Sequence, residues 1–247
     1  MHRVFRTLAL GASAMLATAA AADTVEFESE PHRAQVVELY TSEGCSSCPP
    51  ADRWISTLAD DPGLWRDIVP LAFHVDYWDY LGWRDRFARA EHSQRQRSWA
   101  RERAVRTVYT PGFVVDGREW RAWFSDRKLP GESHRRAGRL TVTVSDSDVD
   151  IAFEPPGPAK GLEAHVALLG FGLETDVRDG ENRGRTLSHD FVVLDINTST
   201  LKAIDDSYGT KLALPASDVI SERYAIAAWV TGPGSQRALQ AAGGWLP

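Results

Sequence analysis

Two cysteines, three residues apart, constrain this chain more than any other feature. Cys45 and Cys48 are the only cysteines among its 247 residues, and they follow an apolar run, Val36 to Thr41, through a short loop. The two prolines after Cys48 are compatible with the first turn of a helix, and unpaired N–H groups at a helix start favour a thiolate. This pattern predicts a local, reversible Cys45–Cys48 disulfide and thiol–disulfide chemistry.

The first 22 residues are typical of a cleaved secretory signal. A basic start with Arg3 and Arg6 precedes an apolar stretch of small residues that ends in Ala20-Ala21-Ala22. This stretch is short for a bilayer span, and no later stretch approaches the necessary length. We expect cleavage after Ala22, export to the periplasm or the extracellular medium, and no membrane span. Because the two cysteines are so close in sequence, their bond cannot join distant parts of the fold.

The charge of the chain argues against nucleic acid as a partner. The formal net charge is −6, and loss of Arg3 and Arg6 with the leader makes it more negative by two units. Nucleic-acid-binding surfaces need a basic patch or stripe. The arginine-rich run from Arg84 to Val105 is more typical of the solvated face of a helix.

The half of the chain that carries the cysteines alternates strands and helices. In chain order, the expected elements are a polar, irregular lead-in (23–34), a strand (36–41), a helix that begins near 49, a second strand (68–75), a long helix (84–105) and a hairpin that turns at Asp116-Gly117. Two strands joined through a helix are expected to be parallel. These elements predict an α/β domain over residues 35–135.

From about Arg139 the pattern changes to short alternating runs. The expected strands cover 140–144, 149–153, 164–169, 191–196 and 224–230. Pro, Gly, Asn and Asp separate them, and no long helical pattern competes. This predicts a second, all-β domain resembling a sandwich over residues 139–247, with a boundary near residues 130–138.

The order of the N-terminal elements resembles the thioredoxin fold. The resemblance implies a thioredoxin-like core with a cis-proline beside the active-site cysteines, and Pro111 occupies that place in the order. It also implies that the backbone at Thr110 pairs with a substrate strand. Enzymes with this fold carry a buried carboxylate before their first cysteine. Glu38, seven residues before Cys45, is either this carboxylate, relaying the proton of Cys48, or a strand-end acid that faces solvent.

More narrowly, the chain resembles the DUF1223 family, exported bacterial proteins with a thioredoxin-like core. The stretches that carry the resemblance are 37–52, 73–83, 109–111 and 180–185, together with His189. These motifs are specific for the family and much less specific for a reaction. The sequence also departs from thioredoxins, because Gly44 precedes the first cysteine and Ser46-Ser47 separates the two.

The leading hypothesis is an exported thiol–disulfide oxidoreductase that acts on protein or small-molecule thiols and needs no cofactor. Cys45 is then the nucleophile and Cys48 the resolving thiol. Tyr77 and Trp78, with Thr110, would hold an extended substrate. Simple packing in the core is the other interpretation of these aromatic residues.

Two other hypotheses stay open. The first is a metal-binding module in which Cys45, Cys48 and His74 hold Cu(I) or Zn(II). The second is a non-catalytic interaction protein whose disulfide is structural. The turn from Gly180 to Arg185 is interpreted either as an anion site or as a plain hairpin loop.

Overall fold

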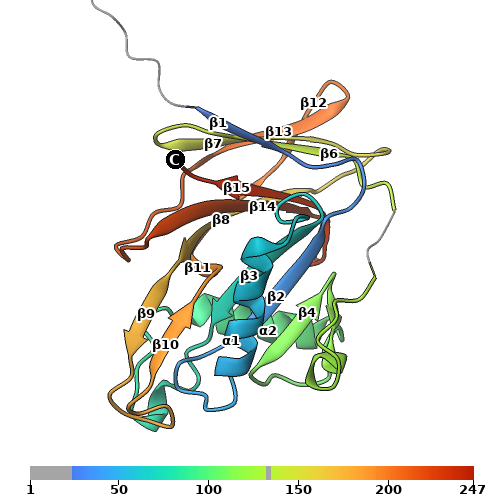
Figure 1. The fold of residues 1–247 in the computed structure, drawn as a ribbon. Coiled ribbons are helices and arrows are strands. Elements are labelled where there is room, and N and C mark those ends of the chain that lie inside the picture. The colour runs from blue at the N-terminus through green and yellow to red at the C-terminus, as the bar shows by residue number, and fades with distance from the viewer. Residues whose placement is uncertain (1–23, 132–134) are drawn as a thin grey trace, which may run out of the picture.

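The computed structural model describes residues 24–131 and 135–247, and strands predominate in it (Figure 1). The predicted signal segment, residues 1–22, lies outside the described residues. The strands are β1 (Val25–Glu28), β2 (Gln35–Thr41), β3 (Ile68–His74), β4 (Gly112–Val115), β5 (Arg118–Glu119), β6 (Arg139–Val144), β7 (Asp148–Glu154), β8 (Glu163–Phe171), β9 (Leu173–Asp176), β10 (Thr186–His189), β11 (Val192–Thr200), β12 (Lys202–Ile204), β13 (Ser207–Ala213), β14 (Arg223–Thr231) and β15 (Ala238–Trp245). The α-helices of the described part are α1 (Pro49–Ser56) and α2 (Ala90–Arg101), and short 3-10 turns cover Thr57–Asp60, Asp79–Leu81 and Arg121–Phe124.

One large sheet runs through both halves of the chain. Its strand order is β15-β14-β8-β11-β3-β2-β4-β5, so strands of the N-terminal half and strands of the C-terminal half form one sheet. A second sheet, β1-β6-β7-β13-β12, forms a layer over one end of it, and β9 and β10 form a separate ribbon (Figure 1).

The expected fold class, a thioredoxin-like α/β domain followed by a separate β-sandwich-like domain, is wrong. The reason is the pairing of β3. β2 pairs with one edge of β3, and the other edge is available to a further strand. β11 occupies this edge, with Val192 opposite Ala72 in a parallel pair and the Ala72 amide donating to the Phe191 carbonyl at 2.9 Å. An unpaired strand edge exposes backbone donors and acceptors, and pairing with β11 satisfies them. The division into units at 35–135 and 139–247 stays a prediction.

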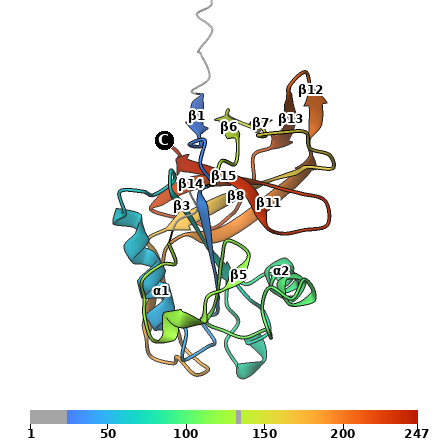
Figure 2. The same ribbon diagram turned by 90° about the vertical axis from the view of Figure 1, so that its right-hand side faces the viewer.

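The two α-helices lie on opposite faces of the large sheet (Figure 2). β2 and β3 are buried along their whole length, as expected of central strands with a covered surface on each side. They pair in parallel, as predicted, with Val36 opposite Val69. The long arginine-rich helix expected over 84–105 is only the twelve residues of α2, because Phe87 and its neighbours form an irregular loop that packs inward.

The second sheet packs on the C-terminal strands of the first through its own apolar core. β6 and β7 alternate buried and less buried residues, which is the period of a sheet with one covered face. The lead-in expected to be irregular contributes β1, which pairs antiparallel with β6. Phe27 of β1 packs over Gly244 of β15, where a Cβ would lie 2.0 Å from its ring. A polar stretch becomes a strand here because its alternate residues cover this core.

The hairpin predicted at Asp116-Gly117 is confirmed: β4 pairs with β5, with Val115 opposite Arg118. Neither α-helix of the described part is long and apolar enough to traverse a bilayer.

Candidate functional site

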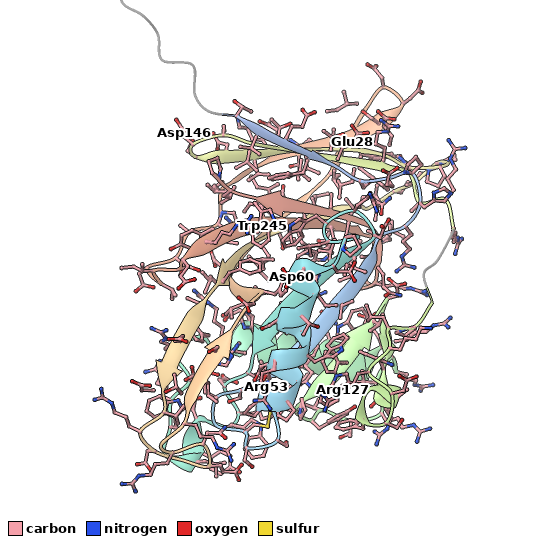
Figure 3. All side chains as sticks on the ribbon, viewed as in Figure 1. Glu28, Arg53, Asp60, Arg127, Asp146 and Trp245 are labelled. Carbon is pink, nitrogen blue, oxygen red and sulfur yellow. A yellow bond between two sulfur atoms is a disulfide. The ribbon has the colours of Figure 1, made fainter. Side chains whose placement is uncertain are left out.

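The predicted disulfide is present in the loop that joins the C-terminal end of β2 to the start of α1. Cys45 and Cys48 are bonded, with their Cα atoms 5.4 Å apart. The Cys45 amide donates to the Ser42 carbonyl at 3.1 Å and the Cys48 amide donates to the Cys45 carbonyl at 3.2 Å, so two consecutive turns lead into the helix. Cys48 is the N-cap of α1 and prolines follow it. In Figure 3 the yellow sulfur bond lies at the end of this helix, beyond Arg53.

Both cysteines are covered, but not equally. Cys45 is 2% exposed and Cys48 is 0% exposed, whereas Ser46 and Ser47 between them are exposed. The Ser47 hydroxyl lies 3.3 Å from the Cys45 sulfur. The two serines therefore mark the side on which the cysteine loop meets solvent.

A turn from the C-terminal half fixes the cysteine loop. The Asn182 amide donates to the carbonyls of Glu43 (2.8 Å) and Cys45 (3.0 Å). Next to it, Glu181 accepts a hydrogen bond from the Ser46 amide at 3.0 Å. The turn from Gly180 to Arg185, interpreted from sequence as an anion site or a plain loop, is thus a clamp on the cysteines.

Beneath the loop lies a buried cluster of carboxylates and histidines. Asp85 accepts hydrogen bonds from His74 Nδ1 (2.7 Å) and from the Glu43 amide (2.9 Å). The His189 ring packs on the His74 ring, with centroids 4.8 Å apart, and its Nε2 lies 3.5 Å from Glu43 Oε1. Trp83 Nε1 donates to the other oxygen of Glu43 at 2.8 Å. Charged groups that are buried this deeply need hydrogen-bond partners or opposite charges, and the side chains of this cluster supply them to one another.

The electrostatics of this buried cluster favour a charged His74. Burial alone lowers the pKa of His74, but the Asp85 carboxylate outweighs burial and raises this pKa to about 9. Burial likewise raises the pKa of Asp85, yet His74 outweighs it and the net shift is downward. At neutral pH the two form an ion pair with no exposed side-chain surface.

Asp52 is a buried acid in α1, the helix that follows the cysteines. It lies four residues after Cys48 in α1, so the two side chains share one face of the helix. Asp52 is buried, and burial raises the pKa of its carboxyl. Burial thus favours the protonated form of Asp52 relative to that of an exposed aspartate.

Thr110 and Trp78, predicted for substrate binding, meet at one edge of the loop, next to the predicted cis-proline Pro111. The Thr110–Pro111 bond is cis, as predicted, and Pro111 precedes Gly112, which pairs with Tyr40 at the end of β2. Trp78 Nε1 donates to Thr110 Oγ1 at 2.7 Å. A Cβ on Gly44 would lie 3.1 Å from the Cβ of Trp78, so glycine allows Trp78 to approach the loop this closely.

Tyr77 and Tyr80 differ in exposure beside Trp78. The Tyr77 hydroxyl donates to Gln96 at 3.0 Å, and burial raises the pKa of Tyr77 to about 12. Tyr80 is 77% exposed and stacks on Trp78 with centroids 6.5 Å apart. Trp78 and Tyr80 thus present an aromatic surface to solvent, whereas Tyr77 is tied to α2.

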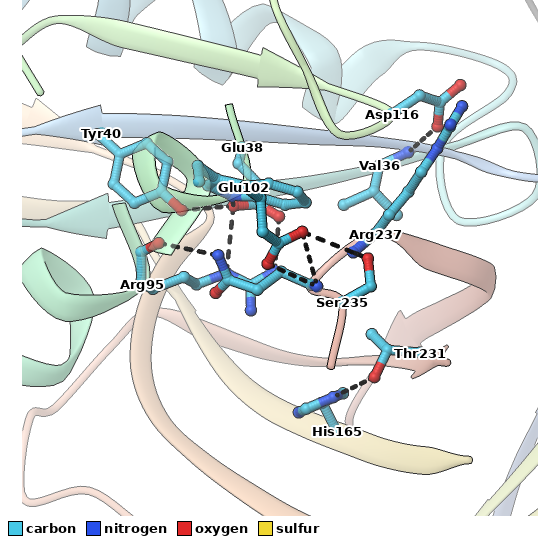
Figure 4. Close-up of polar contacts among 12 residues, drawn as sticks. Val36, Glu38, Tyr40, Arg95, Glu102, Asp116, His165, Thr231, Ser235 and Arg237 are labelled. Carbon is cyan, nitrogen blue, oxygen red and sulfur yellow. Dashed lines mark hydrogen bonds and ion pairs between the residues drawn. The ribbon is translucent and has the colours of Figure 1, made fainter. Parts of the chain in front are cut away.

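Glu38 does not face solvent, so the strand-end alternative is wrong. It is 2% exposed, and Arg95 of α2 binds both of its oxygens, at 2.6 and 3.1 Å (Figure 4). Trp99 and Tyr40 donate to it at 2.8 and 2.6 Å. Within the described part of the chain, these hydrogen bonds run to α2 and to Tyr40 and none reaches the cysteine loop. The proton-relay alternative therefore finds no contact that would support it.

The alternative metal set is not assembled. His74 Nδ1 is bonded to Asp85, and the two cysteines are bonded to each other. Across residues 24–131 and 135–247, no three His, Cys, Asp or Glu side chains are arranged to hold a metal ion.

Comparison with known proteins extends over most of the sequence. The profile of the family described as "Protein of unknown function (DUF1223)" matches residues 36–231. The chain belongs to the DUF1223 family. No curated protein matches it. The crystal structure of protein AGR_C_4864 from Agrobacterium tumefaciens is similar, with 25% identity and a TM-score of 0.57, over 86% of this chain and 93% of that one.

A second solved structure, HBP35 of Porphyromonas gingivalis, is 14% identical, with a TM-score of 0.59, over 88% of this chain and 76% of that one. At this identity the likeness concerns the fold alone. Both similarities run through the two halves of this DUF1223 chain. They therefore agree with one continuous arrangement and not with a thioredoxin-like domain joined to an independent sandwich.

Sequence reasoning missed several residues of this DUF1223 site. Asp52 could have been found, because four-residue spacing from Cys48 puts an acid on the inner helix face beside Ile55. His189 was noted only as part of the family resemblance and Asp85 not at all, since they come from β10 and from a loop, far from the cysteines in sequence. Only the fold brings them together.

Proposed function

We propose that this protein is an exported thiol–disulfide oxidoreductase whose centre is the Cys45–Cys48 pair. The observation that carries the proposal is the position of the disulfide, at the start of α1 and above buried groups that can hold a proton. Structural disulfides usually close longer loops, whereas a loop this short contributes little to stability.

The reaction is a two-electron exchange with a dithiol. A substrate thiolate attacks the Cys45 sulfur, a substrate–Cys45 bond forms, and Cys48 leaves as a thiolate. The second substrate thiolate then attacks the substrate sulfur and releases Cys45 as a thiolate. The substrate has become a disulfide and the pair a dithiol. A small disulfide such as glutathione disulfide reoxidises the pair, and the same steps in reverse reduce a substrate.

Cys45 is the attacked sulfur in this scheme because it is the more exposed of the two and lies beside the two exposed serines. Asp52 supplies a proton to the departing Cys48 thiolate, since both side chains lie on one face of α1 and burial raises the pKa of Asp52. The surface of Trp78 and Tyr80, with Thr110 beside it, receives the chain that carries the substrate thiols.

Trapping of the intermediate tests the proposal. Cys48→Ala leaves Cys45 without its resolving partner, so treatment with glutathione disulfide is expected to accumulate a stable Cys45–glutathione adduct, detected by intact mass. Cys45→Ala is the matched control and forms much less adduct, because Cys48 has no exposed surface. Equal adduct formation by both variants, or by neither, would contradict the assignment of Cys45.

A second candidate function is a structural disulfide in a non-catalytic protein. The nearly complete burial of both cysteines and the Asn182 clamp favour it. The equilibrium reduction potential separates the two functions. A value of about −120 to −270 mV is that of oxidoreductases, whereas a value below about −300 mV marks a disulfide that resists the glutathione pool.

A further inference from the structure

The end of β2 opposite the cysteines carries a cleft rich in arginine. The cleft measures about 400 Å³, and Arg33, Arg118 and Arg237 line it with Asp116. These residues come from four places: the segment before β2, the β4–β5 turn, β5 and the segment before β15. Arg33 and Arg237 are far apart in sequence, so it is the fold that brings their guanidinium groups together.

Arg33 is the buried member of this group. Its side chain is 9% exposed, and its one ion pair, to Asp116 Oδ1, is long at 3.4 Å. Within the described part of the chain, its buried Nε and Nη2 atoms make no hydrogen bond. A buried guanidinium with unused donors is costly unless something accepts from it. Burial lowers the pKa of Arg33, and the neighbouring arginines Arg118 and Arg237 add to this effect.

The arginines outnumber the acids that could neutralise them. Asp116 accepts a hydrogen bond from the Val36 amide at 3.3 Å, so one of its oxygens is already shared. Glu119 also lines the cleft, but it binds the Tyr109 hydroxyl at 2.9 Å and Arg121 at 3.2 Å. Among the described residues that line the cleft, three guanidinium groups thus face one available carboxylate, which leaves about two positive charges there without a counter-charge.

The backbone is shaped to admit Arg237. Gly117 has a φ of +71°, and a Cβ there would lie 2.9 Å from Cγ of Arg237. Glycine is needed both for this turn and for the arginine stem that packs over it. Figure 4 shows Arg237 reaching past Val36 toward Asp116. The cleft is therefore built from a glycine turn and converging side chains, and it is not a chance gathering of surface charges.

We propose that this cleft binds a dianionic phosphate group, held by Arg33, Arg118 and Arg237. Guanidinium groups match phosphate oxygens in planar, two-pronged hydrogen bonds, and a dianion supplies the two missing negative charges. This site is independent of the disulfide, which lies at the other end of β2.

Calorimetric titration of the full chain with inorganic phosphate, at an ionic strength held constant with sodium chloride, tests the proposal. One saturable site is expected. Arg118→Ala and Arg237→Ala are both expected to weaken phosphate binding at least tenfold, because both residues are exposed enough to be changed without loss of the fold. Arg178→Ala is the matched control, an exposed arginine outside the cleft, and leaves the affinity unchanged.

Two further titrants identify the source of the phosphate. Tighter binding of glycerol 3-phosphate than of inorganic phosphate supports the site and indicates an esterified ligand, and the reverse order supports the site with free phosphate. Tighter binding of succinate than of either would overturn the assignment of a phosphate group. Absence of saturable phosphate binding, or equal binding by the Arg118→Ala, Arg237→Ala double variant, would overturn the site.

Discussion

The two ends of β2 both bury charge, but they balance it differently. At the cysteine end, Asp85 and His74 form a pair with no exposed side-chain surface. At the other end, the largely buried Arg33 has, within the described residues, a single long ion pair to Asp116, which lies among three arginines. The difference teaches what each end can do. An ion pair fixes the local structure and the positions of its protons, whereas charges without a partner produce an electrostatic field that attracts a solute of opposite charge.

The largest expected effect is the loss of the matched partner. Asp85→Asn leaves a buried, charged His74 without its counter-ion, and we expect the free energy of unfolding to fall by about 3–5 kcal/mol. Urea denaturation followed by tryptophan fluorescence measures it. Asp146→Asn removes an exposed carboxylate and serves as the control, with a change within about 0.5 kcal/mol. A loss no larger than the control would mean that His74 is neutral in the folded protein.

The pH dependence of stability should have a maximum near pH 6.5. The pKa of His74 is raised to about 9, so the folded state binds the proton more tightly than the unfolded state. The stabilisation is complete below pH 6.5 and is lost as pH rises toward 9, by up to about 3 kcal/mol. Denaturation midpoints measured every half unit from pH 6.5 to 9 test this limb. A flat profile over that range would contradict the ion pair.

The acid limb of the same profile has a different origin. Burial lowers the pKa of His92 to about 4 and that of His165 to about 3. In both cases the unfolded state takes up the proton first, so stability falls as pH drops from 6.5 toward 4. His92→Gln should make this limb shallower, with the contribution of His165 remaining, and leave the alkaline limb unchanged, as denaturation midpoints from pH 4 to 9 would show.

A smaller effect is expected from the clamp on the cysteine loop. Asn182→Ala removes two hydrogen bonds to Glu43 and Cys45. We expect a loss of about 1–2 kcal/mol in stability and faster reduction of the disulfide by dithiothreitol. Asn197→Ala, which removes an exposed hydrogen bond to Ala213, is the matched control. Unchanged reduction kinetics in Asn182→Ala would show that the clamp does not limit access to the sulfurs.

The smallest stability change is expected at the arginine end. Asp116→Asn removes the cleft carboxylate that contacts Arg33 and would compete with a bound anion, so phosphate affinity should rise several-fold while stability in phosphate buffer changes by less than about 1 kcal/mol. Calorimetric titration with inorganic phosphate measures the affinity, and Asp146→Asn serves as the control. Weaker phosphate binding in Asp116→Asn would mean that Asp116 holds the arginines in place more than it competes with the ligand.

Sequence patterns predicted the local features of this molecule. The disulfide, the parallel pair of β2 and β3 and the hairpin at Asp116-Gly117 follow from short stretches, because turn residues and apolar periodicity act over a few positions. The cis bond before Pro111 was instead implied by the resemblance to thioredoxins. The strands expected at 140–144 and 164–169 were found as β6 and β8 for the same reason.

The features that sequence could not predict depend on distant pairing. Whether the edge of β3 stays open or accepts β11 is decided by residues about 120 positions apart, and no local pattern encodes it. Glu38 of β2 was ambiguous because its partner, Arg95, lies in α2, 57 positions along the chain. The arginine cleft was invisible for the same reason, since Arg33 and Arg237 stand at opposite ends of the described chain.

The clamp by Asn182 also has a consequence for how the protein is made. A ribosome delivers Cys45 and Cys48 well before residues 180–185, so a growing chain holds a cysteine pair whose cover has not yet been synthesised. During that interval the two thiols lack the contacts that Glu181 and Asn182 make with their loop in the folded protein. The cover of the cysteine pair is thus completed only after the chain has grown past residue 185.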